Sequence, residues 1–265
     1  MKVDILFSGS SGNCTLVRDG ATEILIDCGK SRRAVSCALA DLGTSLEKIS
    51  AIFITHEHTD HTSALDAVCA KYRIPVHVTR ASAGKIMKFD SVASCAECHE
   101  TEYAVRVGSL TVSSFPLPHD SAECVGYVVR SDGGDVFGTA TDMGHITERA
   151  LCELSSCRRV MIEANHDLEM LAEGPYPPIL KRRIASPRGH LSNESCAELV
   201  CALARRGVKA FALAHLSQEN NLPDLAYGDI RAALDAEGFS ECALVVADRS
   251  FTVSLPEREG DFVNA

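Results

Sequence analysis

Short runs of apolar residues recur along the chain, separated by polar stretches that are rich in Gly, Asp, Asn and Ser. Runs of about four to eight residues between such turn-forming segments are typical of β-strands, including strands that are buried on both faces. The predicted strands span 2–7, 14–18, 23–26, 51–54, 74–78, 110–115, 125–130, 159–163, 208–214, 243–246 and 250–255.

Apolar residues at helical spacing predict helices between these strands. Val35, Leu39 and Leu42 share one helical face. The same spacing recurs over 62–72, 146–154, 193–205 and 226–236. The order of elements is strands first, then mixed strands and helices, repeated once, which predicts an α/β fold of two packed sheets covered outside by helices. This is a four-layer αββα sandwich, although periodicity alone also fits other α/β sandwiches.

The composition changes this picture little. Hydrophobic residues make up 46% of the 265 positions and charged residues 23%, and there is no linker-like tract or internal repeat. We therefore expect a single domain over residues 1–265. Met1 to Phe7 begins a strand almost at once, and no segment has the length of a membrane span. We expect a cytoplasmic protein with no membrane contact.

Twelve cysteines are scattered through predicted helices and strands, and without an export signal most are expected to be reduced core residues. Cys95-Ala96-Glu97-Cys98-His99 matches the attachment signature of c-type haem, which requires export. An accessory metal site or redox pair is a second interpretation. The pattern favours a third, a solvent-facing loop.

The segment His56-Glu57-His58-Thr59-Asp60-His61 directly follows the apolar run 51–54. Residues two apart in an extended strand end point the same way, so His56 and His58 can hold one cation. Asp60 and His61, past the bend, would face a second. Three histidines and a carboxylate at this spacing indicate a metal site with two half-sites.

Three more polar residues stand where predicted strands end: His119, Asp142 and His215. Each alone could be a cap or a hydrogen-bonded core residue. Together with the histidine-rich segment they supply what a two-metal site still lacks. His119 would complete a set with His56 and His58, His215 would join the second half-site, and the Asp142 carboxylate would bridge the two cations. Two-metal hydrolases hold their ions about 3.5 to 4 Å apart in this way.

Charge bears on the substrate. The net charge of −10 opposes nonspecific binding to nucleic acid or anionic lipid. Lys181, Arg182, Arg183 and Arg188 nevertheless cluster just ahead of His190. This basic cluster either holds a chain of phosphates or is a solvated helix face.

These motifs resemble the metallo-β-lactamase superfamily of binuclear hydrolases. The resemblance rests on the HEHTDH segment, on the later ligand candidates, and on Asp27-Cys28-Gly29 after a hydrophobic strand. Longer blocks look like its YycJ/WalJ branch, and they span 8–14, 163–167, 174–177, 189–193 and 215–221. The likeness covers nearly the whole chain.

Members of that branch are bacterial cytoplasmic exonucleases that act on DNA, related to ribonuclease J and the β-CASP nucleases. By this resemblance, Glu163 belongs to the acidic motif that follows the bridging aspartate. His190 is the histidine that contacts the scissile phosphate, and His215 is the last metal-binding histidine. The chain has no room for the large β-CASP cap, so we expect short loops to hold the substrate.

Two groups of residues are candidates for supporting roles. The glycine-rich loop with Ser10 and Asn13 could bring backbone N–H groups near a phosphate, although a tight turn between two strands is the simpler interpretation. Glu163 and His166 could orient ligands, or could merely cap a strand end.

The resulting hypothesis is a binuclear metal-dependent phosphodiester hydrolase, a 5′ to 3′ DNA exonuclease. Two divalent transition-metal ions are expected, and imidazole and carboxylate ligands fit zinc, manganese or iron. Asp60 would orient or deprotonate the nucleophile, and His190, aided by arginines such as Arg188, would neutralise charge on the phosphoryl oxygens. The alternatives are a hydrolase of thioesters, lactones or lactams on the same scaffold, and a non-catalytic regulatory protein that uses metal for stability.

Overall fold

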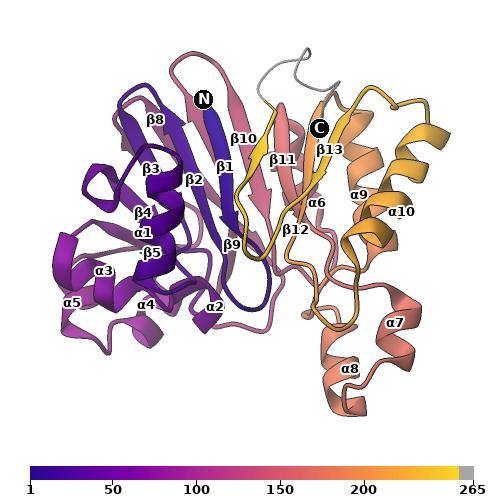
Figure 1. Ribbon diagram of the computed structural model, residues 1–265, viewed down its shortest axis with the longest axis horizontal. Helices are drawn as coiled ribbons and strands as arrows, with labels where there is room; N and C mark the ends of the chain where they lie inside the picture. The colour runs from indigo at the N-terminus through magenta and orange to yellow at the C-terminus, as the bar shows by residue number, and fades with distance from the viewer. Residues whose placement is uncertain (257–265) are drawn as a thin grey trace.

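A computed structural model describes residues 1–256 and shows two sheets packed face to face with helices on the outside of each (Figure 1). The predicted αββα sandwich is confirmed. None of the described helices is both long enough and apolar enough to cross a lipid bilayer.

The first sheet holds seven strands in the order β14-β1-β2-β3-β4-β5-β6. They are β1 (Lys2–Phe7), β2 (Cys14–Asp19), β3 (Thr22–Ile26), β4 (Ala51–Phe53), β5 (Val76–Thr79), β6 (Ala96–His99) and β14 (Val253–Leu255). The strands from β3 to β6 are parallel to one another. Their carboxyl ends therefore meet at one edge of the sheet.

The second sheet also holds seven strands, in the order β13-β12-β11-β10-β9-β8-β7. They are β7 (Ala104–Val107), β8 (Leu110–Leu117), β9 (Cys124–Ser131), β10 (Val136–Ala140), β11 (Arg159–Glu163), β12 (Ala210–Ala214) and β13 (Ala243–Val246). From β10 to β13 the strands are parallel. This second set of carboxyl ends lies at the bottom of the molecule in Figure 1, near α2, α7 and α8.

Helices cover both outer faces. Beside the first sheet lie α1 (Arg32–Asp41), η1 (Leu46–Lys48), α2 (Thr59–Thr62), α3 (Leu65–Tyr72), α4 (Arg80–Ile86) and α5 (Asp90–Ala93). The second half of the chain holds α6 (Glu148–Ser155), α7 (Leu168–Glu173), α8 (Pro178–Ile184), α9 (Asn193–Ala204) and α10 (Pro223–Ala236). Figure 1 shows α7 and α8 projecting below the sandwich.

The alternation of side chains explains why the strands are apolar throughout. In β3, Leu25 packs outward in a cluster with Val35 and Leu39 of α1, whereas Ile24 and Ile26 join the cluster between the sheets. A third cluster packs the second sheet against α6, α9 and α10. Because both faces of each sheet are covered, period-2 alternation of polar residues is absent from the central strands.

Most predicted elements are confirmed, and the misses have local causes. The prediction omitted β6, β7 and β10, together with α4, α5, α7 and α8. β6 and β7 are half-exposed edge strands that carry charged residues, and β10 has Gly138 at its centre. The solvent-facing loop expected around Cys95 is wrong, because Cys95 is buried and Ala96–His99 pairs with β5.

Candidate metal centre

The candidate site residues lie where strands of the two sheets end. His56 follows β4 in the first sheet, while Asp142 and His215 follow β10 and β12 in the second. Because β10, β11 and β12 are parallel, the loops after them leave the sheet at the same edge. Ligands far apart in sequence are thereby brought to one place, as is common for sites carried by rigid scaffolds.

The backbone at these strand ends is strained. Asp27, Asp142 and His215 have φ angles of 61°, 60° and 56°. A non-glycine residue in this left-handed region costs of the order of 1–3 kcal/mol, and such residues cluster at functional sites. The Asp142 and His215 side chains face each other, with His215 Nδ1 3.5 Å from Asp142 Oδ1, and the Asp27 carboxylate faces His61.

The histidine-rich segment divides between two groups, as the spacing predicts. His58 is the N-cap of α2, and Asp60 and His61 lie within that helix, so the chain bends after His58. The ligand atoms of His56, His58 and His119 lie within 4.8 Å of one another. This group brings a loop of the first sheet against a loop of the second.

Asp60, His61 and His215 form the second group, again within 4.8 Å of one another. Asp142 lies between the two groups. One of its carboxylate oxygens, Oδ2, is 3.2 Å from His61 Nε2, and the other, Oδ1, is 3.7 Å from His119 Nε2. The Asp142 carboxylate thus lies near one residue of each group, and its role as a bridging ligand stays a prediction.

Most of these imidazoles are fixed through Nδ1, which leaves Nε2 for the centre. His61 Nδ1 lies 2.7 Å from Asp27 Oδ2, and His119 Nδ1 lies 3.1 Å from the carbonyl oxygen of Gly189. His56 Nδ1 lies 3.1 Å from the Thr55 hydroxyl. Metal-binding histidines are held by such outer contacts, which set the tautomer and the ring orientation.

The donor set fits metal ions because three of its buried polar atoms have no hydrogen-bond partner among residues 1–256. These atoms are His56 Nε2, His119 Nε2 and Asp142 Oδ2, and the 3.2 Å contact of Asp142 Oδ2 with His61 Nε2 is an ion pair. Leaving a buried polar atom unpaired costs about 1–3 kcal/mol, so three at one point need a common explanation. Imidazole and carboxylate ligands facing one space are what zinc, manganese or iron ions bind.

Burial and charge act on the protonation of these groups. Burial lowers the pKa of His56 and of His119 and keeps them neutral, with a lone pair available. Burial also opposes the charged form of His61 and His215, but nearby carboxylates outweigh it and raise their pKa. The pKa of Asp142 is held well below its usual range by these imidazoles despite its own burial. Positive charge is thus strongly favoured at the Asp142 side of the cluster.

Glu163 is a fully buried residue behind the second group, and its carboxylate accepts several hydrogen bonds. Its Oε1 accepts hydrogen bonds from Nδ1 of His190 at 2.7 Å and from Nδ1 of His215 at 2.9 Å. Its Oε2 accepts from the backbone N–H groups of Met143 and Leu191. Burial alone would raise the pKa of Glu163, but these contacts, with His190 foremost, lower it to about 2. An ionised Glu163 therefore orients both rings.

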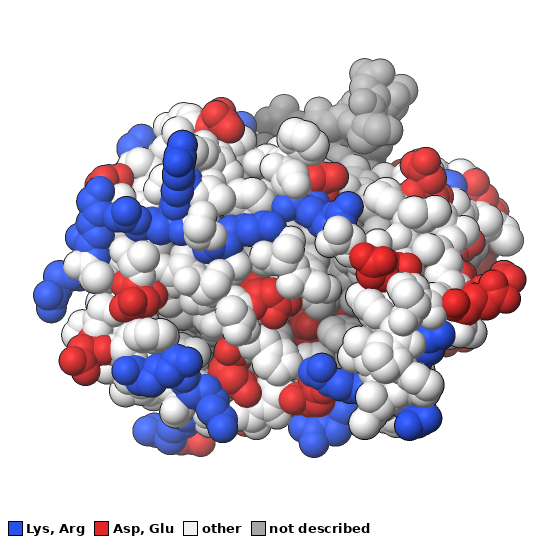
Figure 2. All heavy atoms as spheres, turned by 60° about the horizontal axis from the view of Figure 1, so that its bottom comes forward, with Lys and Arg blue, Asp and Glu red and all other residues white. Residues whose placement is uncertain are grey.

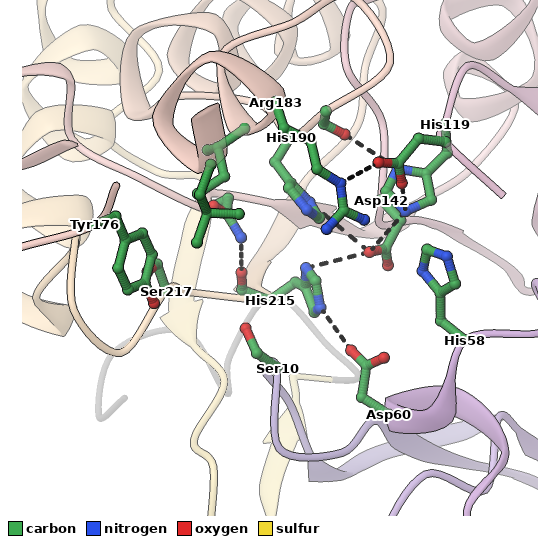
Figure 3. Close-up of a pocket in the computed structure, with 15 residues that line it drawn as sticks. Ser10, His58, Asp60, His119, Asp142, Tyr176, Arg183, His190, His215 and Ser217 are labelled. Carbon is green, nitrogen blue, oxygen red and sulfur yellow. Dashed lines mark hydrogen bonds and ion pairs between the residues drawn. The ribbon is translucent and has the colours of Figure 1, made fainter. Parts of the chain in front are cut away.

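A cavity of about 270 Å³ opens over these residues (Figure 3). Its lining includes His58, Asp60, His119, Asp142, His190 and His215, together with Ser10 on the opposite rim. The segment around α8 supplies a wall that the sequence did not reveal. That wall contains Tyr176, Leu180, Arg183 and Ile184.

The basic cluster is largely engaged within the protein. Arg183 pairs with Asp120, and the Lys181 ammonium donates to the Ala172 carbonyl at 2.6 Å. The Arg188 guanidinium donates to the carbonyl oxygen of His119 at 2.6 and 2.9 Å. Arg188 thus steadies the loop that carries His119.

The glycine-rich loop reaches the centre through Asn13. Its amide nitrogen lies 3.4 Å from Asp60 Oδ2 and 3.0 Å from His61 Nε2, and its Oδ1 accepts from the Gly9 N–H at 2.8 Å. Ser10 lines the cavity. The loop is therefore a turn between β1 and β2 that also contacts the site.

His166 lies apart from both ligand groups. Its backbone bridges to Ser192, its carbonyl accepts from the Asn193 N–H at 2.9 Å, and its buried Nδ1 has no hydrogen-bond partner among the described residues. Its predicted role in orienting ligands stays a prediction.

Asp27 is a functional candidate that the sequence analysis did not name as a site residue. Its carboxylate accepts hydrogen bonds from the backbone and hydroxyl of Thr55 and from His61. It joins the loop after β3 to the histidine-rich segment. The signal was present in the sequence as an acidic residue directly after a hydrophobic strand, in Asp27-Cys28-Gly29.

Comparison with known proteins identifies a matching family, similar sequences and a similar fold. Residues 22–215 match the family model described as a beta-lactamase superfamily domain. The chain is 30% identical over 239 residues to exodeoxyribonuclease YycJ of Bacillus anthracis, with 89% of each chain covered. It is 33% identical over 230 residues to exodeoxyribonuclease WalJ of Streptococcus pneumoniae D39, with 85% of each covered. The crystal structure of the metallo-beta-lactamase fold protein YhfI from Bacillus subtilis superposes with a TM-score of 0.71 at 15% identity, covering 96% of this chain and 98% of that one.

Proposed function

The chain belongs to the metallo-β-lactamase superfamily, and we propose that within it the protein is a binuclear metal-dependent phosphodiester hydrolase that degrades DNA from an end. The observation that carries the proposal is the convergence of two groups of ligand atoms on the Asp142 carboxylate, where three buried polar atoms have no hydrogen-bond partner among residues 1–256. The substrate class comes from the relatives, which are called exodeoxyribonucleases and are matched over most of their length.

The ligands of one ion would be His56, His58 and His119, and those of the other Asp60, His61 and His215, with Asp142 shared. Two divalent ions held there would supply Lewis acidity toward the scissile phosphate and would acidify a water molecule. Zinc, manganese and iron all fit this donor set.

The remaining residues would position the attacking water and neutralise negative charge on the phosphate. Asp60, whose carboxylate lines the cavity, would orient the attacking water and accept its proton. His190 presents the nitrogen not bound by Glu163 to the same cavity, where it would donate to a phosphoryl oxygen as negative charge grows. Glu163 is a positioning residue that acts through His190 and His215.

End-labelled DNA provides the test. Metal-reconstituted protein should be incubated with single- and double-stranded DNA and RNA labelled at the 5′ or the 3′ end. We expect DNA to be shortened with release of mononucleotides, and 5′ to 3′ polarity predicts early release of a 5′ label. Thioester and lactone substrates should be tested in parallel. If these small substrates are hydrolysed while the DNA is left uncleaved, the protein is instead a small-molecule hydrolase on the same fold.

A further inference from the structure

The rim of the cavity opposite α8 carries basic side chains that lie over the glycine-rich loop. Ser10 of this loop lines the cavity. Arg249 packs across Gly9, with its Cγ 3.4 Å from the point where a Gly9 Cβ would lie. The Lys30 ammonium donates to the Ser11 hydroxyl at 2.7 Å. Figure 2 shows a row of lysine and arginine side chains crossing this face of the molecule.

These cations differ from Arg183, the α8 cation that lines the cavity, in having no acidic partner among the described residues. Arg32, Arg33 and Arg249 are exposed and form no ion pair with any residue from 1 to 256, whereas Arg183 across the cavity is neutralised by Asp120. The protein has a net charge of −10, so most of its surface repels a polyanion. Unpaired positive charge beside the proposed phosphodiesterase site would favour binding of a polyanion there.

An exposed aromatic residue follows Arg249 by two positions in the same turn. Phe251 leaves 74% of its surface exposed. The turn that carries it is fixed, because Asp248 Oδ1 accepts from the backbone N–H groups of Ser250 at 2.6 Å and Phe251 at 2.9 Å. The Asp248 carbonyl also accepts from the Ser8 N–H at 3.0 Å, so the turn is anchored to the loop that reaches the cavity.

We propose that Lys30, Arg249 and Phe251 form a binding track for a single strand of DNA that leads into the cavity. This inference rests on the proposed function. Phosphates lie against Lys30 and Arg249, and one unpaired base stacks on the Phe251 ring. A base inside a duplex has both faces covered by its neighbours, so the track favours single-stranded or frayed ends over paired ones.

Binding measurements test the track. Metal-loaded wild type and the variants Arg249→Ala and Phe251→Ala should be titrated with a fluorescent phosphorothioate strand of about twelve nucleotides, within the site size of single-strand binders. We expect each variant to weaken binding about five- to a hundredfold. Arg249→Ala should also reduce the slope of log affinity against log salt by about 0.7. The matched duplex should be affected less.

Two matched controls separate the track from general surface effects. Arg206→Ala removes a cation at the amino ends of β11 and β12, the opposite end of the second sheet, where its guanidinium donates to the Ala202 carbonyl. Tyr227→Ala removes a half-exposed ring from α10. Both should bind the strand as wild type does.

A short substrate separates this proposal from the proposed function. The p-nitrophenyl ester of thymidine 5′-monophosphate reaches the cavity without crossing the rim, so its turnover by wild type and by the two control variants reports on the metal centre alone. If wild type cleaves DNA and both track variants bind the strand as tightly as wild type does, the binding track is wrong. The proposed nuclease function would then be unaffected. Wild type that neither binds nor cleaves DNA would overturn the proposed function itself. Equal losses for strand and duplex would assign the rim to duplex DNA instead.

Discussion

At the scale of single residues, His190 is the side chain whose function is most open to a clean test. It lines the cavity and its Nδ1 is held by the buried Glu163. Its Nδ1 is 3.8 Å from Asp142 Oδ1, and the ligand atoms of His190, Asp142, Glu163 and His215 lie within 4.8 Å of one another. His190 therefore stands beside both the cavity and the ligand groups, and an experiment distinguishes a contact with the substrate phosphate from a role as an ion ligand.

His190→Ala should cut kcat and kcat/KM together while both ions stay bound, because the donor acts on charge that develops only in the transition state. Loss of one such donor typically costs about 10²- to 10³-fold in rate. Steady-state kinetics on DNA and elemental analysis of the same preparation measure both quantities. Loss of an ion would make His190 a ligand.

Asp142 offers a different residue-scale prediction, because its two oxygens face the two ligand groups. Asp142→Ala should lower the occupancy of both ions from close to two per chain in wild type. His56→Ala, which removes a ligand from one group only, is the matched comparison and should lower one occupancy. Elemental analysis of the metal content shows whether Asp142 serves one ion or both. Loss of a single ion in Asp142→Ala would make this residue a terminal ligand.

At the scale of elements, the short helix α2 owes its position to backbone contacts with the loop after β3 and with the glycine-rich loop between β1 and β2. The Cys28 N–H donates to the His61 carbonyl at 2.9 Å, and the Asn13 N–H donates to the Asp60 carbonyl at 2.7 Å. A Cβ on Gly29 would lie 1.6 Å from the Asp60 carbonyl oxygen. The absence of a side chain at position 29 is what allows α2 to approach.

Gly29→Ala should push α2 away, destabilising the protein by about 1–3 kcal/mol, the usual range for overpacking. It should also weaken the ion held by Asp60 and His61. Urea unfolding and metal titration measure the two effects.

Gly84→Ala is the control, because Gly84 lies in α4 with nothing within 4 Å of an added Cβ. Its stability should stay the same or rise by up to about 1 kcal/mol, since alanine favours the helix. Equal behaviour of the two variants would show that the Gly29 contact relaxes without cost.

At the scale of the whole molecule, the metal centre joins the two sheets. His56, His58, Asp60 and His61 follow strand β4 of the first sheet, whereas His119, Asp142 and His215 follow strands of the second. A direct link beside them is the buried Tyr127 of β9, whose hydroxyl donates to the Ile54 carbonyl at 2.6 Å. Ions bound between the sheets would stabilise the sandwich as a unit.

Removing the ions should accordingly lower the melting temperature. Binding at a hundred times Kd contributes about 2.7 kcal/mol per ion, and each kcal/mol shifts Tm by roughly 2–4 °C in a domain of this size. We expect chelation of both ions to lower Tm by about 10–20 °C and re-addition of metal to restore it, as followed by calorimetry. Asp142→Ala protein should respond much less, and an unchanged wild-type Tm would contradict a centre that joins the sheets.

Local pattern was sufficient for the central strands, for the longer helices and for about half of the candidate site. Central strands are continuous apolar runs because both of their faces are covered, and helices such as α9 keep a clear period. The edge strands β6 and β7 were missed because half-exposed strands carry charged residues in place of an apolar run. The cluster of His56, His58, Asp60 and His61 was visible because its members are adjacent in sequence.

Only the tertiary structure decided which distant residues meet. Parallel pairing of β10, β11 and β12 brings Asp142 and His215 to one edge and puts the buried Glu163 behind them. The partner of Arg183 is Asp120, far away in sequence, so a cluster that looked free to bind phosphate is partly neutralised. Sequence determines which groups a chain has, but the field at a site depends on distance and burial, and these are set by packing between elements.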